Sequence, residues 1–235
     1  MRFETTRWSL VLAAGGDDSV AARTAFGRLY ETYWYPVYAY VRRRGRDAEA
    51  ARDLTQAVFA SLYERRDFEH LDRARGRFRS FLLAATQHYL ANDAAYRHAA
   101  KRGGGVAPLP LESDRAEERY RHEPADRQTP ETLFDRRWAL TVIERTMATL
   151  REDYERAGRA ALFDALQSSL LGETTDGGYQ AIATATGQTA GAVKTSAHRL
   201  RRRFQDELRR QIEATVHDLD DVDDEIRSLI RAIAD

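Results

Sequence analysis

The side chains best suited to chemistry lie together between Tyr179 and Phe204, a segment rich in cations and hydroxyl groups. At about 100° per residue, Val193, Ala197 and Leu200 fall on one side of a predicted helix. The other side carries hydroxyl, imidazole, ammonium and guanidinium groups. Ammonium and guanidinium groups bind phosphates, and all of these groups can hydrogen-bond to base edges. This side of the helix is therefore suited to the major groove of DNA.

A turn signal precedes this helix. Ala183 lies on a predicted short helix that reaches Gly187, and the second helix begins after Thr189. A small residue where helices cross, a glycine in the turn and a threonine N-cap are typical of a helix-turn-helix. The alternative is a solvated basic helix in an ordinary bundle. The candidate DNA-binding residues here are Thr189, Gly191, Lys194, Thr195, His198, Arg199 and Arg202.

A second group of candidates lies on a predicted helix from Ala48 to about Arg65, whose core stripe includes Leu54 and Val58. The opposite side combines two aromatic rings with a carboxylate and an amide, a mixture that often marks a protein interface. The alternative is that a neighbouring helix covers the two rings. The candidate interface residues are Asp53, Gln56, Phe59 and Tyr63.

A third group lies in and around a helix predicted from about Arg75 to Ala100, where basic groups alternate with aromatic rings. This combination suits a DNA strand whose bases are partly unstacked. Phe78, Phe81 and Tyr89 fit a core stripe better, so the candidates are the polar and terminal basic residues. These are Arg77, Arg79, Gln87, His88, Lys101 and Arg102.

Other chemistry has little support. The chain has no cysteine, which excludes disulfides and thiol catalysis and fits a reducing cytoplasm. Its six histidines lack metal-ligand spacing, and Gly103–Gly105 lacks the ending of a phosphate-binding loop. No apolar run is long enough to span a membrane. We expect a cytoplasmic, non-enzymatic protein without a metal or another cofactor.

The chain is predicted to be all-α, with two helical domains joined by a flexible linker, because its apolar residues recur at helical spacing. Glycines, prolines and mixed charges mark the linker. The formal net charge is zero, but basic stretches and an acidic C-terminal stretch are separated. That stretch could fold back on the Arg199–Arg203 face, remain solvated or form a short capping helix. The expected segments are a domain over 1–102, the linker over 103–128, a second domain over 129–212 and the acidic extension over 213–235.

Two motifs, in this order, resemble the conserved regions of bacterial sigma factors. The run Asp53-Leu54-Thr55-Gln56, followed by Val58-Phe59, is similar to the core of sigma region 2. The run Phe78-Arg79-Ser80-Phe81-Leu82 resembles the adjoining segment, which melts the promoter and captures −10 bases. Tyr179 to Arg203 resembles region 4, which reads the −35 element. With no region 3 between them, the layout resembles the extracytoplasmic-function (ECF) class, over roughly residues 20–102 and 130–212.

The resemblance implies a factor that directs core RNA polymerase to promoter DNA and initiates transcription there. Asp53, Gln56 and Phe59 would contact the polymerase clamp, and an anti-sigma protein or other regulator could be a further partner. Gln87 and His88 would lie near the non-template strand, although His88 replaces the usual Asn and leaves the −10 base preference open. The −35 groove would face Lys194, Thr195, His198, Arg199 and Arg202.

Two other functions are compatible with parts of this pattern. An ordinary helix-turn-helix regulator would bind duplex DNA without polymerase, but it does not account for the patch around Gln56. A helical scaffold or anti-sigma-like protein would bind no DNA, and the basic helix argues against it.

Overall fold

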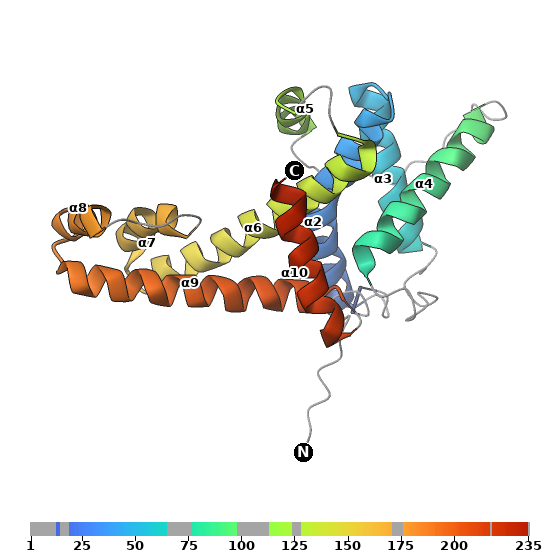
Figure 1. Cartoon of the computed structure of the whole chain (residues 1–235). Coiled ribbons are helices and arrows are strands. Elements are labelled where there is room, and N and C mark those ends of the chain that lie inside the picture. Colours follow the sequence, from blue (N-terminus) through green and yellow to red (C-terminus); the bar gives the residue numbers. More distant parts are fainter. Residues whose placement is uncertain are drawn as a thin grey trace, which may run out of the picture. The chain divides into compact units, whose positions relative to one another are not determined.

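The computed structural model of the chain describes residues 13–14, 19–64, 77–97, 113–123, 128–170, 176–216 and 218–234. These residues are almost all helical, which confirms the predicted all-α class (Figure 1). Among them, the one extended pairing is an isolated antiparallel bridge between Arg77 and Val216. The main helices are α2 (Val20–Arg43), α3 (Ala48–Glu64), α4 (Phe78–Arg97), α5 (Ser113–Arg121), α6 (Pro130–Arg156), α7 (Ala160–Leu166), α8 (Asp176–Thr186), α9 (Ala190–Glu213) and α10 (Leu219–Ala234).

The chain divides into two compact units, and the second is inserted in the sequence of the first. Unit 1 comprises Met1–Thr141 and Ile212–Asp235, and unit 2 comprises Val142–Gln211. This division differs from the domain limits expected from the sequence. The first part of α6 belongs to unit 1, and the segment expected to be a separate acidic extension also belongs to unit 1.

The ends of the helices follow local signals. The Ser19 hydroxyl accepts a hydrogen bond from the Ala22 N–H at 3.1 Å, which caps α2. Gly45 follows this helix with φ +85°, a conformation that favours glycine. The Asp47 carboxylate then accepts from the Ala50 N–H at 2.8 Å and caps α3, as its position in the sequence predicts.

Helix α2 is the centre of unit 1, because it is buried over nearly all of its second half. Tyr33, Val37, Tyr38 and Tyr40 are all 1 % exposed or less. The three phenols among these residues require polar partners, since an unpaired polar group in the interior is costly. Their partners come from residues that are distant in sequence, which is how α2 organises the unit.

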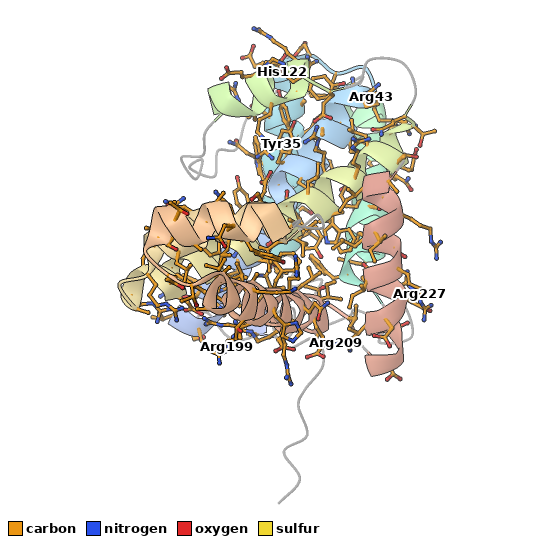
Figure 2. All side chains as sticks on the ribbon, turned by 60° about the vertical axis from the view of Figure 1, so that its left-hand side comes forward. Tyr35, Arg43, His122, Arg199, Arg209 and Arg227 are labelled. Carbon is orange, nitrogen blue, oxygen red and sulfur yellow. The ribbon has the colours of Figure 1, made fainter. Side chains whose placement is uncertain are left out.

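Part of the predicted flexible linker is instead a helix that packs on α2. The Tyr35 hydroxyl donates to Glu123 at 2.8 Å and the Tyr38 hydroxyl donates to Glu117 at 2.6 Å. Arg42 also pairs with Glu117 at 2.9 Å. Figure 2 labels Tyr35 and His122, the residue that precedes Glu123 in the sequence. The linker prediction is therefore wrong for residues 113–123, because carboxylates in this charged segment find partners on α2. The remaining linker residues, 103–112 and 124–127, lie outside the described part.

The acidic C-terminal stretch is neither solvated nor a cap on unit 2 but contributes α10 to the core of unit 1. Val222 and Leu229 are buried, and so is the charged residue Glu225. Of the three alternatives that the sequence left open, a short helix is the one observed. Glu225 of this helix is buried in unit 1, whereas Asp223 and Asp224 are exposed.

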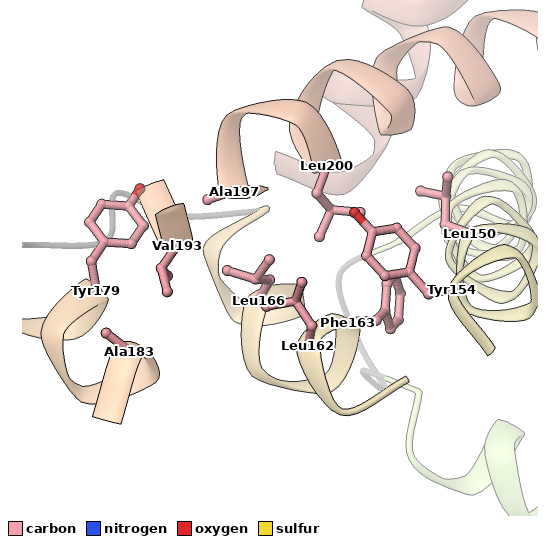
Figure 3. Packing of buried hydrophobic residues seen from close by; sticks show 10 residues of the cluster. All are labelled: Leu150, Tyr154, Leu162, Phe163, Leu166, Tyr179, Ala183, Val193, Ala197 and Leu200. Atoms are coloured by element: carbon pink, nitrogen blue, oxygen red, sulfur yellow. The ribbon is translucent and has the colours of Figure 1, made fainter. Parts of the chain in front are cut away.

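Unit 2 has a hydrophobic core of its own, built from the second part of α6 and from α7, α8 and α9 (Figure 3). A short 3₁₀ helix, Gln167–Ser169, extends α7. The helix α8 begins at Asp176 and ends at Thr186. The core residues are Leu150, Tyr154, Leu162, Phe163, Leu166, Tyr179, Ala183, Val193, Ala197 and Leu200.

Candidate functional site

The turn between α8 and α9 has the geometry of a helix-turn-helix. Gly187 has φ +64°, in the left-handed region that a side chain would disfavour. The Thr189 hydroxyl accepts from the Ala192 N–H at 3.2 Å and its carbonyl accepts from the Val193 N–H at 3.0 Å. Ala183 is 2 % exposed within the core of unit 2. The predicted small residue, turn glycine and threonine N-cap are thus all present.

The two sides of α9 are as the sequence predicts. Val193, Ala197 and Leu200 have no exposed surface. The candidate residues on the other side are all exposed, and Arg199 is labelled in Figure 2. They form one surface, which we call the α9 surface and which consists of Thr189, Gly191, Lys194, Thr195, His198, Arg199 and Arg202.

The arginines of α9 fall into two sets. Arg203 pairs with Asp153 at 2.7 Å and lies over the Tyr154 ring, so it contributes to the packing of α9 on α6. Arg201 donates to the Tyr179 hydroxyl at 3.3 Å. In contrast, Arg199 and Arg202 have no ion pair or side-chain hydrogen bond with any described residue. These two guanidinium groups are available to an external anion.

Fewer of the candidate interface residues on α3 are exposed than predicted. Asp53 is exposed and Gln56 is half-buried, whereas Phe59 is only 2 % exposed. The Phe59 ring packs against Tyr30 at 4.9 Å and Phe26 at 6.4 Å, both on α2. For Phe59, the alternative of a covering helix is therefore the one observed, because α2 covers its ring. Tyr63 remains 42 % exposed, with its ring against Phe26 at 5.0 Å.

Arg79, a candidate for DNA contact, is instead buried in unit 1. Its guanidinium forms two hydrogen bonds with the Glu225 carboxylate, both at 2.9 Å, and also pairs with Asp135. It lies over the Trp138 ring, 4.5 Å from the centroid. Burial alone lowers the pKa of Arg79, but the hydrogen bonds and charges of Glu225 and Asp135 outweigh that effect and raise it above the ordinary value. The guanidinium therefore stays charged and paired, and Arg79 does not face DNA.

The other candidates around α4 have different environments. Arg77 is half-buried and pairs with Glu225 at 3.2 Å. The Gln87 amide donates to Glu131 at 3.4 Å. His88 is exposed, and its Nδ1 lies 3.4 Å from the Asn92 amide nitrogen. Lys101 and Arg102 lie outside the described residues. Among the described residues of this group, His88 is the exposed one.

Sequence reasoning missed the two acidic partners that shape unit 1, Glu225 and Glu123. Both carboxylates are almost fully buried and each pairs with an arginine, Glu225 with Arg79 and Glu123 with Arg137. The pairing of Arg79 with Glu225 spans 146 positions, so no local spacing could indicate it. The available signal was that these acids occupy amphipathic segments beside apolar residues.

Other functional sites find no support among the described residues. No group of three or more histidine, cysteine, aspartate or glutamate side chains in this part of the chain could hold a metal ion. No described helix is long and apolar enough to cross a membrane.

A comparison with known families found a similarity in the first half of the chain. Residues 29–102, which contain most of α2 together with α3 and α4, match the model of Sigma-70 region 2. A search of curated proteins and a search of solved structures each found no match. The match covers 74 of the 235 residues, so it shows that this part of the chain is similar to Sigma-70 region 2.

Proposed function

We propose that the chain is a sigma factor of the ECF class, which directs core RNA polymerase to specific promoters. The observation that carries this proposal is the match of residues 29–102 to Sigma-70 region 2. In the proposal, α3 binds polymerase through Asp53, Gln56 and the exposed part of Tyr63. Phe59 acts indirectly, by packing α3 on α2. The chain has no chemistry of its own and acts in the cytoplasm with the polymerase.

The α9 surface reads the −35 element in this proposal. Its exposed cations and hydroxyl groups lie on one side of a helix that follows a helix-turn-helix turn, a geometry that suits the major groove. The −10 element is bound by α4 in this proposal. The candidate contact residues are His88 and Gln87, together with Lys101 and Arg102, which lie outside the described residues. Arg79 is not a candidate for contact with the −10 element because it is buried. Half-buried Arg77 remains a candidate.

Binding to core RNA polymerase tests the proposal. Gel filtration of the chain with bacterial core polymerase should give a stable complex. The Asp53→Ala/Gln56→Ala double variant should weaken it, and Glu49→Ala, an exposed carboxylate on the same helix, is the matched control. If the folded chain does not bind polymerase but binds duplex DNA alone, it is an ordinary helix-turn-helix regulator and the proposal fails.

A regulator such as an anti-sigma protein would inhibit the chain by covering either the α3 residues or the α9 surface. The same polymerase assay detects such a partner, because it would dissociate the complex in proportion to its concentration.

A further inference from the structure

Gln87, one of the candidates for the −10 element, is held by residues from two other helices of unit 1. Its amide nitrogen donates to Oε1 of Glu131 on α6 at 3.4 Å, and the Tyr40 hydroxyl on α2 donates to the same oxygen at 3.3 Å. All three residues belong to unit 1, although Gln87 and Glu131 are 44 positions apart. Glu131 lies outside residues 29–102, so a residue beyond the part similar to Sigma-70 region 2 contributes to the candidate surface on α4.

The chemistry of Glu131 determines which end of the Gln87 amide faces it. A carboxylate accepts hydrogen bonds and has none to donate. The opposite orientation of the amide would place the Gln87 oxygen against the Glu131 oxygen, and neither would have a hydrogen to share. The NH2 group of Gln87 therefore faces Glu131, and its carbonyl oxygen points away from the carboxylate.

Tyr40 is a second acceptor for the same NH2 group. Burial raises the pKa of Tyr40, and a hydrogen bond that Gln87 donates to the phenol oxygen opposes this rise. Tyr40 has no exposed surface, so the packing of α2 fixes the position of this oxygen. The two N–H groups of Gln87 thus have two acceptors within unit 1, Glu131 and Tyr40.

The carbonyl oxygen is the end of Gln87 that remains available. None of the residues that the structure describes donates a hydrogen bond to it, and the Gln87 side chain is only half-buried. A carbonyl oxygen in such a position needs a donor from outside the protein, because a polar atom that loses water without gaining a partner is costly. Gln87 therefore offers a bound molecule one acceptor and no donor.

The four bases differ in what they present to such an acceptor. Adenine and cytosine carry an amino group, N6 or N4, on the edge where guanine and thymine carry an oxygen, O6 or O4. A glutamine with both ends free recognises adenine by accepting from N6 and donating to N7. Because the N–H groups of Gln87 are already engaged, N7 of adenine provides no further contact.

We propose that Gln87 acts as a hydrogen-bond acceptor only and selects adenine or cytosine over guanine and thymine at one position of the −10 element. Glu131 is the positioning residue that sets this selectivity, because it holds the NH2 group away from the base. The inference rests on the proposed function, since it concerns the DNA surface on α4. Its consequence is that adenine and cytosine are accepted about equally, which a glutamine using both ends would not give.

The orientation of Gln87 is tested first without DNA or polymerase. In NMR spectra of the nitrogen-labelled full chain, the Gln87 side-chain amide is assigned by its absence in Gln87→Leu. Its protons should exchange with water more slowly than those of an exposed glutamine such as Gln205. Glu131→Ala should remove this protection.

Thr129→Ala is the matched control for Glu131→Ala. It removes the N-cap of the same helix, where the Thr129 hydroxyl accepts from the Thr132 N–H at 3.1 Å, and it leaves Glu131 in place. The Gln87 amide should therefore stay protected in this variant. Unprotected Gln87 protons in the unaltered chain, or an equal loss of protection in both variants, would overturn the positioning role of Glu131.

Base selection is tested with core polymerase. Promoters are selected from a random DNA pool with the intact chain, and each position of the −10 element is then changed to all four bases. At one position, adenine and cytosine should give similar amounts of transcript. Guanine and thymine should give at least about fivefold less, because two facing acceptors both lack a hydrogen-bond partner.

The variants should change the pattern of preference at that position. Glu131→Ala frees an N–H group of Gln87, so adenine should become preferred over cytosine and the rejection of guanine and thymine should weaken. Thr129→Ala should keep the original preference, and Gln87→Leu should abolish it.

Three results would overturn the proposal. The first is a preference for adenine over cytosine in the intact chain, and the second is an unchanged preference in Gln87→Leu. The third is an equal change for all four bases in Glu131→Ala, which would indicate that the carboxylate only repels DNA. If the chain does not bind polymerase, the proposed function fails and base selection fails with it, whereas the NMR measurement still decides whether Glu131 orients Gln87.

Discussion

The environment of single side chains decides which basic residues of this chain can bind DNA. Arg79 and Arg199 are both arginines in helices, but Arg79 is enclosed by Glu225, Asp135 and Trp138, whereas Arg199 faces solvent. Once paired in the interior, a guanidinium cannot leave its carboxylate without stranding a buried charge. The position of a basic residue beside a recognisable motif therefore does not by itself show that the residue contacts DNA.

Replacing the buried carboxylate should be costly. Glu225→Ala removes the partner of Arg79 and leaves a buried cation uncompensated, so the free energy of unfolding should fall by about 3–5 kcal/mol. Asp224→Ala, at a side chain that is 51 % exposed, should lower it by about 1 kcal/mol or less. Urea unfolding followed by circular dichroism measures both, and similar losses would contradict the account of Glu225.

Buried tyrosines should make unit 1 sensitive to alkaline pH. Burial raises the pKa of Tyr30 to about 12, and it raises the pKa values of Tyr33, Tyr35 and Tyr38 further. In the unfolded chain these phenols ionise near pH 10. Their stabilising effect is therefore complete below pH 10 and is lost as the pH rises through the folded-state pKa values, by up to about 1.4 kcal/mol per pH unit for each phenol.

Unfolding free energies measured from pH 8 to pH 12 should thus be flat at first and then decline steeply above pH 10. Tyr30→Phe removes one ionising phenol, so the free energy of unfolding should decline less steeply above pH 10, by up to about 1.4 kcal/mol per pH unit. A profile that is flat up to pH 12, or one that Tyr30→Phe does not change, would show that the phenols ionise equally in both states.

At the scale of elements, signals near in sequence predicted the structure well. The caps at Asp47 and Thr189, and the glycine turns at Gly45 and Gly187, all arise from neighbours within a few positions. The same reasoning missed α5 and left open whether Phe59 is buried. The position of α5 and the burial of Phe59 both depend on contacts with α2 that are made by residues distant in sequence. Such contacts cannot be predicted from the spacing of neighbouring residues.

The two glycines around the α8–α9 turn should respond in opposite directions. Gly187→Ala forces a side chain into φ +64° and should destabilise unit 2 by about 1–2 kcal/mol. Gly191→Ala adds a Cβ in open space on a helix and should stabilise the fold by up to about 1 kcal/mol. If the α9 surface lies in the major groove, Gly191→Ala nevertheless weakens DNA binding. Thermal unfolding and fluorescence anisotropy with promoter DNA separate the two effects.

Charge removal tests the α9 surface directly. Arg199→Ala and Arg202→Ala should each weaken binding to promoter DNA and reduce the slope of log affinity against log salt by about 0.9 per lost phosphate contact. Arg210→Ala is the matched control, because Arg210 is exposed on the same helix but pairs with Glu207 outside this surface. An equal effect of all three variants would indicate a diffuse electrostatic attraction rather than a defined surface.

At the scale of the whole molecule, the sequence predicted two helical units but not how the chain is distributed between them. The predicted limits assumed that each unit is a continuous stretch. In the structure unit 1 is made of two stretches, because Glu225 of α10 pairs with Arg79 near the start of α4, and Arg79 also pairs with Asp135 of α6. Composition marked 213–235 as acidic, but its pairing with Arg79 depends on the assembled fold.

Removing the second stretch should therefore weaken unit 1 and leave unit 2 largely unaffected. In a chain that ends at Gln211, amide hydrogen exchange should accelerate in α2 and α4, and the Phe78 amide should lose protection because its Thr215 acceptor is gone. Exchange in α7 and α8 should change little, since their core lies within 142–211. Faster exchange confined to unit 2 would contradict this division.

The divided unit 1 also has a consequence during protein synthesis. Ribosomes add about 5–20 residues per second, and N-terminal domains usually fold while the rest of the chain is still being made. Here Arg79 is synthesised long before its partner Glu225, with all of unit 2 in between. The nascent helices α2, α3 and α4 must therefore wait several seconds with an incomplete core. Until Glu225 has been synthesised and has paired with Arg79, apolar surface of unit 1 stays exposed, and chaperones bind such surfaces on unfinished chains.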